Sequence, residues 1–335
     1  MAYDKPWISY LEQLDKLKKR GLNVSDDDKA VAYLERIGYY RLSGYWFPFR
    51  KRTEECCPIF KEGRAKFKKG MKDKLVLEEF KQGAEFQQAV ELYVFDKKLR
   101  LLVMDALERI EVALRVDISH ALGKHHEFAY LKPELFRDDF AKILDKKSGL
   151  TRHHQWLQNH ARLINRSKEK FIQHNKIKYG LPLAVWIACE VWDFGCLSRL
   201  FEGMKPEEQN VISAKYGIEK GTVFISWLRC LNYLRNICAH HSRLWNRNII
   251  DQPKKPSPGE AAFFESGWDN PHILARPFLQ FCIIQHLLCT INPSSSWWEG
   301  LSALLGEFPD LTVLDLNLEG MGAIQGWEQW DWKAK

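Results

Sequence analysis

The spacing of apolar residues predicts helices from the start of the chain. Apolar residues recur every three or four positions between Ile8 and Leu17, where Gly21 follows, and between Val31 and Ile37. The stretch Ser25–Asp28 places a capping residue and acidic side chains at the start of the second helix. The segment GYYRLSGYWFPF, residues 38–49, then predicts a compact aromatic turn between helices.

The longest apolar pattern runs from about Phe80 to Leu122 and stops at Gly123. About forty residues is long for one helix, so we expect a break in this pattern near Gly83. The strongly apolar stretch 181–201 predicts a helix with Pro182 in its first turn. Further helical patterns cover residues 138–180, 207–217, 224–241, 273–291 and 297–305.

The chain contains no alternating pattern that would predict a useful strand, and the sequence therefore predicts an all-α fold. We expect three parts. An N-terminal helical and aromatic-turn region covers residues 1–75, a helical core covers 76–291, and a C-terminal helix with an irregular tail covers 292–335.

Composition narrows the class of protein. The chain has 335 residues, 45% of them hydrophobic and 13% aromatic, which indicates a folded globular protein. Its formal net charge of +7 favours an anionic partner such as RNA. The longest apolar runs are interrupted by polar residues and no leader pattern opens the chain, so we expect a cytoplasmic protein without a membrane partner.

The eight cysteines form no Cys-x-x-Cys pair. Several lie in apolar helical patterns, so the cysteines are expected to be buried free thiols rather than zinc ligands. Neither a glycine-rich phosphate loop nor a metal motif occurs in the chain. We therefore expect no metal and no cofactor.

The sharpest chemical signal is LNYLRNICAHHSRLWNRN, residues 231–248. It places Arg235, Asn236 and His240 close together, and the same spacing of arginine and histidine recurs at Arg115 and His120. Histidine can exchange a proton near neutral pH, and arginine matches the geometry of a phosphate. Together they suit metal-independent cleavage of RNA, in which the 2′-OH attacks the neighbouring phosphate.

Simpler interpretations compete with this one. An Arg-x4-His match is short, and a chain with 11 histidines contains such matches by chance. Arg115 has a ready partner in Glu111 one turn earlier. On a regular helix, residues five positions apart diverge by about 140°, so one motif alone would not bring its arginine and histidine together. We expect a second motif to complete the site.

Two more residues belong to the candidate site in a supporting role. His241 falls on the apolar stripe of its predicted helix and is expected to be a buried core residue, which favours His240 as the reactive imidazole. Glu190 lies among apolar residues and is expected to be a mostly buried carboxylate with a cationic partner. That pair is either purely structural or supports an active-site arginine.

Two segments could bind RNA. Arg162, Arg166 and Lys170 are spaced four apart, which predicts one basic face on a helix. The opposite face would carry Leu157, Ala161, Ile164 and Phe171. Arg41 lies in the aromatic segment 38–49, where rings and cations suit single-stranded nucleic acid. A solvated helix face and a packed helical corner are the alternatives.

The chain resembles the Abi family of bacterial abortive-infection proteins, the AbiD/AbiF-like group. The resemblance rests on segments spread over nearly the whole chain: 33–49, 108–122, 181–201, 233–247, and the tail around Met321 and Trp327. It implies a HEPN-like helical bundle. HEPN ribonucleases carry an arginine, a polar residue and a histidine at the spacing of Arg235, Asn236 and His240, whereas Val116 replaces the polar residue after Arg115.

The sequence and the resemblance together predict a toxin-like endoribonuclease of anti-phage defence. It would leave 2′,3′-cyclic phosphate and 5′-OH ends, with Arg115 and Arg235 on the phosphate, His120 and His240 as acid and base, and Asn236 orienting them. The site would form within one chain or across a homodimer. The alternative is a non-catalytic HEPN-like protein that holds a structured noncoding RNA or senses a phage component; some members of the family are encoded beside such an RNA.

Overall fold

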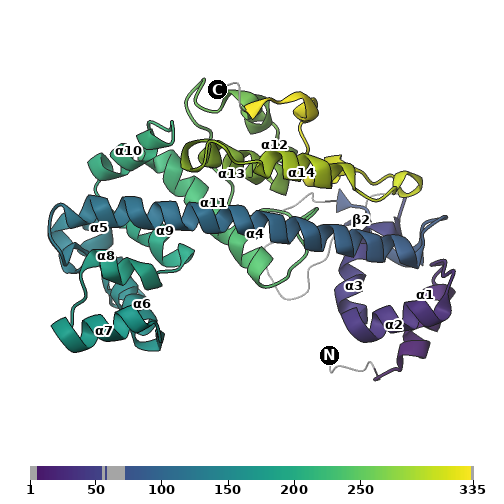
Figure 1. The fold of residues 1–335 in the computed structure, drawn as a ribbon. Coiled ribbons are helices and arrows are strands. Elements are labelled where there is room, and N and C mark those ends of the chain that lie inside the picture. The colour runs from purple at the N-terminus through teal and green to yellow at the C-terminus, as the bar shows by residue number, and fades with distance from the viewer. Residues whose placement is uncertain (1–5, 55–56, 59–71, 333–335) are drawn as a thin grey trace. The chain divides into compact units, whose positions relative to one another are not determined.

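The computed structural model describes residues 6–54, 57–58 and 72–332 (Figure 1). Helices dominate this part of the chain, as the apolar pattern predicts, and the all-α assignment is confirmed. The chain divides into two compact units. Unit 1 contains Met1–Lys98 and Leu304–Glu319, and unit 2 contains Leu99–Ala303 and Gly320–Lys335.

Unit 1 begins with three helices: α1 (Tyr10–Lys19), α2 (Asp27–Ile37) and α3 (Tyr39–Trp46). Asp26 caps α2 through the backbone N–H of Lys29, as its sequence predicts. The expected aromatic turn over 38–49 is wrong, because α3 occupies most of it and the 3-10 helix η1 (Phe47–Phe49) the rest. The buried side chains of Leu42, Tyr45 and Trp46 explain this: they form one face of a helix.

Short strands follow in unit 1. Strand β1 (Arg50–Arg52) pairs antiparallel with β4 (Val76–Phe80), so that Arg50 lies opposite Phe80. Strand β2 (Cys57–Pro58) pairs antiparallel with β3 (Lys72–Asp73). The polar residues of this region give little apolar alternation, which is why the sequence did not reveal these strands.

Helix α4 (Phe86–Gly123) has 38 residues and contains the point at which the two units divide. It ends at Gly123 as predicted, and the apolar pattern breaks at Gly83 as expected, but the 38 residues after that break form one continuous helix. Gly83 has a positive φ of 80° and lies in the turn before the helix, not inside it. In unit 2 the buried residues Val103, Leu107, Ile110, Leu114 and Ile118 recur along the helix, so packing offsets its unusual length.

The rest of unit 2 is a set of shorter helices. They are α5 (Asp138–Ala141), α6 (Arg152–Arg166), α7 (Lys170–Tyr179), α8 (Val185–Ala188), α9 (Phe194–Gly203), α10 (Pro206–Lys215), α11 (Gly221–Ala239), α12 (Pro271–Leu274), α13 (Pro277–Ile291) and, beginning in unit 2, α14 (Trp297–Gly306). The 3-10 helices after η1 are η2 (Ala129–Leu131), η3 (Pro133–Leu135), η4 (Cys189–Val191), η5 (Ala262–Asp269), η6 (Thr312–Leu314), η7 (Leu318–Met321) and η8 (Trp327–Gln329).

The segment 181–201 is not one helix starting at Pro182. Pro182 precedes helical structure, which begins with α8 after the cap residue Ala184. A break at Trp192 and Asp193 then separates η4 from α9, where Asp193 accepts a hydrogen bond from the Cys196 N–H at 2.8 Å. The apolar run therefore contains an internal helix start, which apolar spacing alone did not resolve.

Helix α13 forms the centre of unit 2, with twelve buried residues from Pro277 to Leu288. Helix α11 packs against α13, α9 and α10. Gly221 at the start of α11 allows a close approach to α10, since a Cβ there would lie 2.6 Å from the Gln209 Cβ. None of the described helices combines the length and the apolar character needed to cross a membrane.

A buried aromatic box joins α6 to the segment before α9. The His160 ring stacks on Trp156 at a centroid distance of 5.5 Å, and the Trp192 indole N–H donates to His160 Nδ1 at 2.9 Å. Tyr130 packs edge-on against Trp192, and Trp156 donates to the Cys196 carbonyl at 2.9 Å. Burial lowers the pKa of His160 to about 4, so the ring is neutral and can accept the indole hydrogen bond.

This box predicts a pH-dependent loss of stability. The folded-state pKa of His160 lies below the ordinary value of 6.5, so the unfolded chain takes up this proton first as the pH falls. The free energy of unfolding should therefore drop between pH 6.5 and about 4, by about 2–3 kcal/mol from this residue.

Urea unfolding of the wild type, His160→Gln and His174→Gln across this pH range measures the effect. Glutamine can still accept from Trp192 but does not titrate, so the His160→Gln curve should be flatter than the wild type. His174 is exposed on α7, and its variant should follow the wild type. Equal pH dependence in all three proteins would contradict the assignment.

Candidate functional site

The arginines of the two Arg-x4-His motifs act on one carboxylate, that of Glu111. Glu111 and Arg115 lie one turn apart on α4, while Arg235 lies in the last turns of α11, which crosses α4 (Figure 1). Burial raises the pKa of Glu111, and the positive charges of Arg115 and then Arg235 oppose that rise. The two motifs thus share an electrostatic neighbourhood within unit 2.

Arg115 is held by acceptors on several sides. Its Nη2 donates to Glu111 Oε1 at 3.1 Å and to the carbonyl oxygen of Trp192 at 3.1 Å. Its Nη1 lies 3.6 Å from Glu190 Oε2. The Arg115 side chain is only 15% exposed, so these contacts fix its guanidinium in a mostly dry position.

Glu190 has the predicted cationic partner but not the predicted burial. Its side chain is 47% exposed, although its neighbours in the sequence are apolar. Glu190 follows the buried Cys189 in the 3-10 helix η4 and occupies the exposed side of that turn. Glu111, at 18% exposure, is the buried carboxylate of the site.

Helix α11 ends within the sequence motif. Its last residue is Ala239, His240 is the C-cap, and His241 follows in the left-handed conformation with φ of 55°. The His241 N–H donates to the Cys238 carbonyl at 3.0 Å and the Ser242 N–H to the Ile237 carbonyl at 2.9 Å, which is the Schellman arrangement.

The predicted burial of His241 is therefore wrong. Because the helix stops at Ala239, the apolar stripe that includes Leu234 and Cys238 does not continue to His241, which is exposed. The left-handed conformation at this position usually belongs to glycine. Burial of His241 consequently gives no reason to prefer His240, and the choice depends on what each ring can reach.

Both candidate imidazoles lie on solvent-facing surfaces. His240 and Asn236 are exposed and four positions apart, so they share one face of α11, whereas the half-buried Arg235 acts electrostatically on Glu111. His120 is exposed on α4, turned about 140° from Arg115 by helix geometry. Both rings are therefore open to solvent in the described part of the chain.

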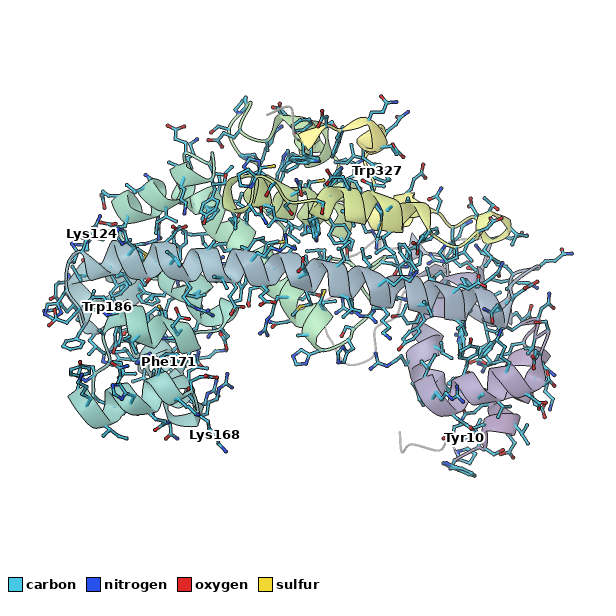
Figure 2. The ribbon with its side chains drawn as sticks, viewed as in Figure 1. Tyr10, Lys124, Lys168, Phe171, Trp186 and Trp327 are labelled. Atoms are coloured by element: carbon cyan, nitrogen blue, oxygen red, sulfur yellow. The ribbon has the colours of Figure 1, made fainter. Side chains whose placement is uncertain are left out.

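The residues of the predicted RNA-binding face, 162–170, lie on two helices rather than one. Arg162 and Arg166 are exposed on α6, but that helix ends at Arg166 and Lys170 begins α7. Of the residues expected on the opposite face, Ile164 is buried and Leu157 is half-buried, whereas Ala161 and Phe171 are exposed; Figure 2 labels Phe171 on α7. Arg41 is exposed on α3 of unit 1.

Two residues of the candidate site, Trp192 and Asp193, were not predicted from the sequence. Trp192 supplies a backbone carbonyl to Arg115, and Asp193 adds negative charge that raises the pKa of Glu111. The Phe194 N–H, at the start of α9, opposes it by hydrogen bonding to Glu111. The helix-capping pattern of Asp193 was a readable signal, because an aspartate directly before an apolar periodic stretch is typical of a helix start.

The cysteines and metal-binding groups add little to the site. Among the described cysteines, Cys189, Cys196, Cys230, Cys238 and Cys282 are buried free thiols, as predicted. Burial raises the pKa of Cys189 to about 11, which keeps this thiol near Arg115 protonated. No group of three His, Cys, Asp or Glu side chains in the described residues is placed to hold a metal ion.

Comparison with known proteins gives one match. No curated protein and no solved structure matches the chain. The model of the Abi-like protein family matches residues 32–246, which is more than half of the chain and includes both Arg-x4-His motifs, Glu190 and Asp193. The chain therefore belongs to the Abi-like protein family.

Proposed function

We propose that this protein is a metal-independent endoribonuclease that acts as an effector of abortive infection. Membership of the Abi-like family indicates a role in abortive-infection defence. The observation that carries the enzymatic part of the proposal is that Arg115 binds Glu111 at 3.1 Å while the positive charge of Arg235 acts on the same carboxylate. Two motifs that are 120 positions apart in the chain thereby contribute to one charged neighbourhood.

The chemistry that we propose needs no external nucleophile. A neutral histidine removes the proton of the RNA 2′-OH, whose oxygen attacks the adjacent phosphorus, and a protonated histidine donates a proton to the departing 5′-oxygen. The products are a 2′,3′-cyclic phosphate and a 5′-OH. His240 and His120 are the proposed base and acid, Arg235 and Arg115 bind the phosphate, and Asn236 beside His240 orients the reacting groups.

The half-buried Glu111 supports this arrangement physically. A phosphate that binds two arginines gains most when their side chains are already fixed, because little conformational entropy is then lost. Glu111 and the Trp192 carbonyl hold Arg115, and the same carboxylate attracts Arg235. Arg115 is thus positioned before any ligand arrives, and the charge of Glu111 attracts Arg235 to the same neighbourhood.

An RNA-binding role without cleavage is the second candidate, and one observation favours it. Arg115 already has Glu111, Glu190 and a carbonyl oxygen as partners, which suits a structural guanidinium as well as a phosphate ligand. The imidazoles also lie on helix faces turned away from their arginines. A homodimer that brings His120 or His240 of a second copy to these arginines would restore the composite site.

Removal of a proposed catalytic imidazole gives the first functional test. His240→Ala should lower the rate of RNA cleavage by about 10²–10⁴-fold, because positioned general acid–base catalysis contributes that much. The assay incubates purified protein with RNA in EDTA and measures 5′-OH ends. His174→Ala, which removes an exposed histidine of α7, serves as the matched control.

Three results of this assay have different meanings. Loss of cleavage in His240→Ala but not in His174→Ala supports the proposal. Tight RNA binding by wild-type protein without cleavage would favour the second candidate. Cleavage that persists when His120 and His240 are both alanine would refute the assignment of these residues.

Glu190 provides a second test, because its carboxylate competes with a phosphate for Arg115. Glu190→Gln should raise RNA affinity by up to about fivefold, the effect of losing a partly exposed ion pair worth about 1 kcal/mol. Fluorescence anisotropy with labelled RNA measures the change. Glu79→Gln, which removes an exposed partner of Lys51, is the control. Unchanged or weaker binding in Glu190→Gln would identify the Arg115–Glu190 pair as structural.

A further inference from the structure

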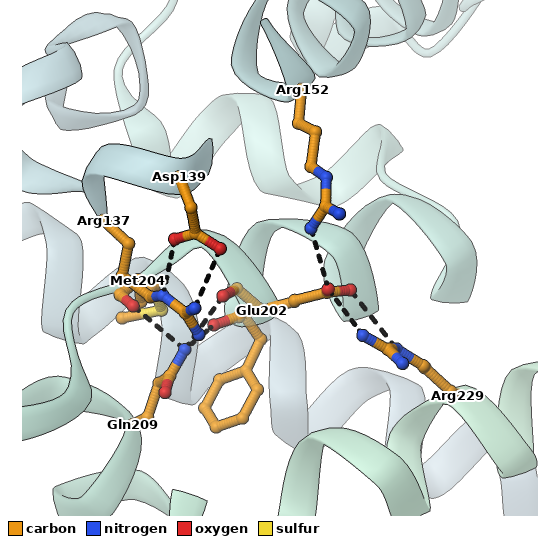
Figure 3. A network of polar contacts seen from close by, with 8 residues as sticks. Arg137, Asp139, Arg152, Glu202, Met204, Gln209 and Arg229 are labelled. Carbon is orange, nitrogen blue, oxygen red and sulfur yellow. Dashed lines mark hydrogen bonds and ion pairs between the residues drawn. The ribbon is translucent and has the colours of Figure 1, made fainter. Parts of the chain in front are cut away.

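A second cluster of arginines lies at the far end of α9 from Asp193. Glu202 in the last turn of α9 accepts hydrogen bonds from Arg229 Nη2 at 2.6 Å and from Arg152 Nη1 at 3.4 Å (Figure 3). Arg199, one turn earlier on α9, is exposed and lines the same pocket as Arg152 and Glu202. Three helices, α6, α9 and α11, therefore direct cations to one place.

The end of α9 is rigid at this point. The side-chain amide of Gln209 is 1% exposed, and its Nε2 lies 2.9–3.0 Å from the carbonyl oxygens of Phe201, Glu202 and Met204 (Figure 3). These contacts satisfy backbone acceptors that a helix end otherwise leaves open. Glu202 is consequently fixed, and it fixes the two arginines that bind it.

The positive side chains of the cluster outnumber its one negative side chain. Arg152 and Arg229 bind the single carboxylate of Glu202, and Arg199 lines the same pocket, so these four side chains carry two positive charges in excess. The side chains of Arg152 and Arg229 are 58% and 54% exposed, so each retains donors that face solvent. The pocket has a volume of about 280 Å³, and the remaining lining residues are Phe140, Gln155 and Trp156. An anion of phosphate size fits such a site, since arginine binds phosphate with the same fork that binds carboxylate.

A polar face of α11 connects this cluster to the candidate site. Arg229, Tyr233, Asn236 and His240 are spaced four, three and four positions apart, which places them along one side of the helix. Arg229, Asn236 and His240 are exposed, and Tyr233 is half-buried. With a rise of 1.5 Å per residue, Arg229 and His240 lie about 16 Å apart along the axis.

Another cation reinforces the middle of this face. The Nε and Nη2 atoms of Arg247 donate to the Tyr233 hydroxyl at 3.3 and 3.4 Å, so a ring and a guanidinium lie together between the two ends. Alternation of cations with an aromatic ring is typical of surfaces that bind single-stranded nucleic acid without reading its sequence. The Arg152–Arg199–Arg229 cluster would then bind a phosphate a few nucleotides from the one at Arg235.

We propose that a single strand of RNA runs along this face of α11, from His240 past Tyr233 to the Arg152–Arg199–Arg229 cluster, and that the cluster binds its backbone. The proposal rests on RNA being the ligand of the proposed function. It assigns RNA binding to residues other than Arg162 and Arg166, which lie on the same helix as Arg152 but pair with no acidic residue at the end of α9. Binding here is to phosphates, so it is independent of base sequence.

The test compares double variants in the His240→Ala background, which separates binding from cleavage. The probe is a fluorescein-labelled RNA of about 12 nucleotides, within the length that a small single-strand-binding fold covers. Its affinity is measured by anisotropy between about 50 and about 200 mM KCl. Arg152→Gln with Arg199→Gln should weaken binding and reduce the slope of log K against log salt by about 1.4, two phosphate contacts at about 0.7 each.

Two further double variants make the result specific. Lys16→Gln with Lys19→Gln removes the same charge from α1, where both lysines are exposed, and should leave affinity and slope unchanged. Arg162→Gln with Arg166→Gln should have a smaller effect than Arg152→Gln with Arg199→Gln. Thermal unfolding checks that each variant remains folded; Glu202 keeps Arg229 as its partner in the first double variant.

The outcomes distinguish this proposal from the proposed catalytic function. An unchanged slope in Arg152→Gln with Arg199→Gln overturns the binding path, as does an equal effect of the Lys16 and Lys19 changes or a larger effect of the Arg162 and Arg166 changes. Wild-type protein that fails to bind the probe also overturns it. If the wild type binds RNA without cutting it and the slope falls as expected, the catalytic proposal fails and the binding path stands.

Discussion

The hydrogen bond between Arg115 and the Trp192 carbonyl is the contact on which the candidate site depends. A carbonyl oxygen can position an arginine only if the backbone that carries it is immobile. The side chain of Trp192 itself holds that backbone in place. The ring is buried against Tyr130 and Trp156, and its N–H is bonded to a neutral His160. Packing of one indole thus holds a segment without regular structure, and that segment in turn holds a cation. The aromatic box is therefore part of the site although none of its rings reaches the Arg-x4-His motifs.

Charge balance imposes the next constraint. Two arginines close to each other repel, and partial burial strengthens that repulsion. Glu111 offsets it at the cost of its own desolvation, which is visible in the raised pKa of its carboxyl. Glu190 contributes a second, more exposed negative charge to Arg115. The two carboxylates have separate consequences: removal of Glu111 would leave buried like charges unbalanced, whereas removal of Glu190 leaves solvent to screen the change.

Particular residues show how far the sequence could predict this structure. Asp26 and Gly123 mark helix ends correctly because capping is a local property of the backbone. The pairing of Arg115 with Glu111 was also readable, since it needs only one turn of α4. The start of α9 at Asp193 was missed although its cap is local. The exposure of Glu190 and the left-handed His241 were not predicted, because both depend on where tertiary packing interrupts an apolar pattern. The approach of Arg235 to Glu111 joins separate helices, and spacing within either motif contains no information about it.

The continuity of α4 affects how the protein can be divided. The boundary between the units falls between Lys98 and Leu99, inside a helix rather than in a linker. Each unit also takes part of its chain from beyond residue 303. The stretch that matches the Abi-like family, residues 32–246, lacks α13, whose buried residues form the centre of unit 2. A fragment restricted to that stretch would expose the faces that α13 covers, so the region that defines the family by sequence is not a module that could be transplanted into another protein.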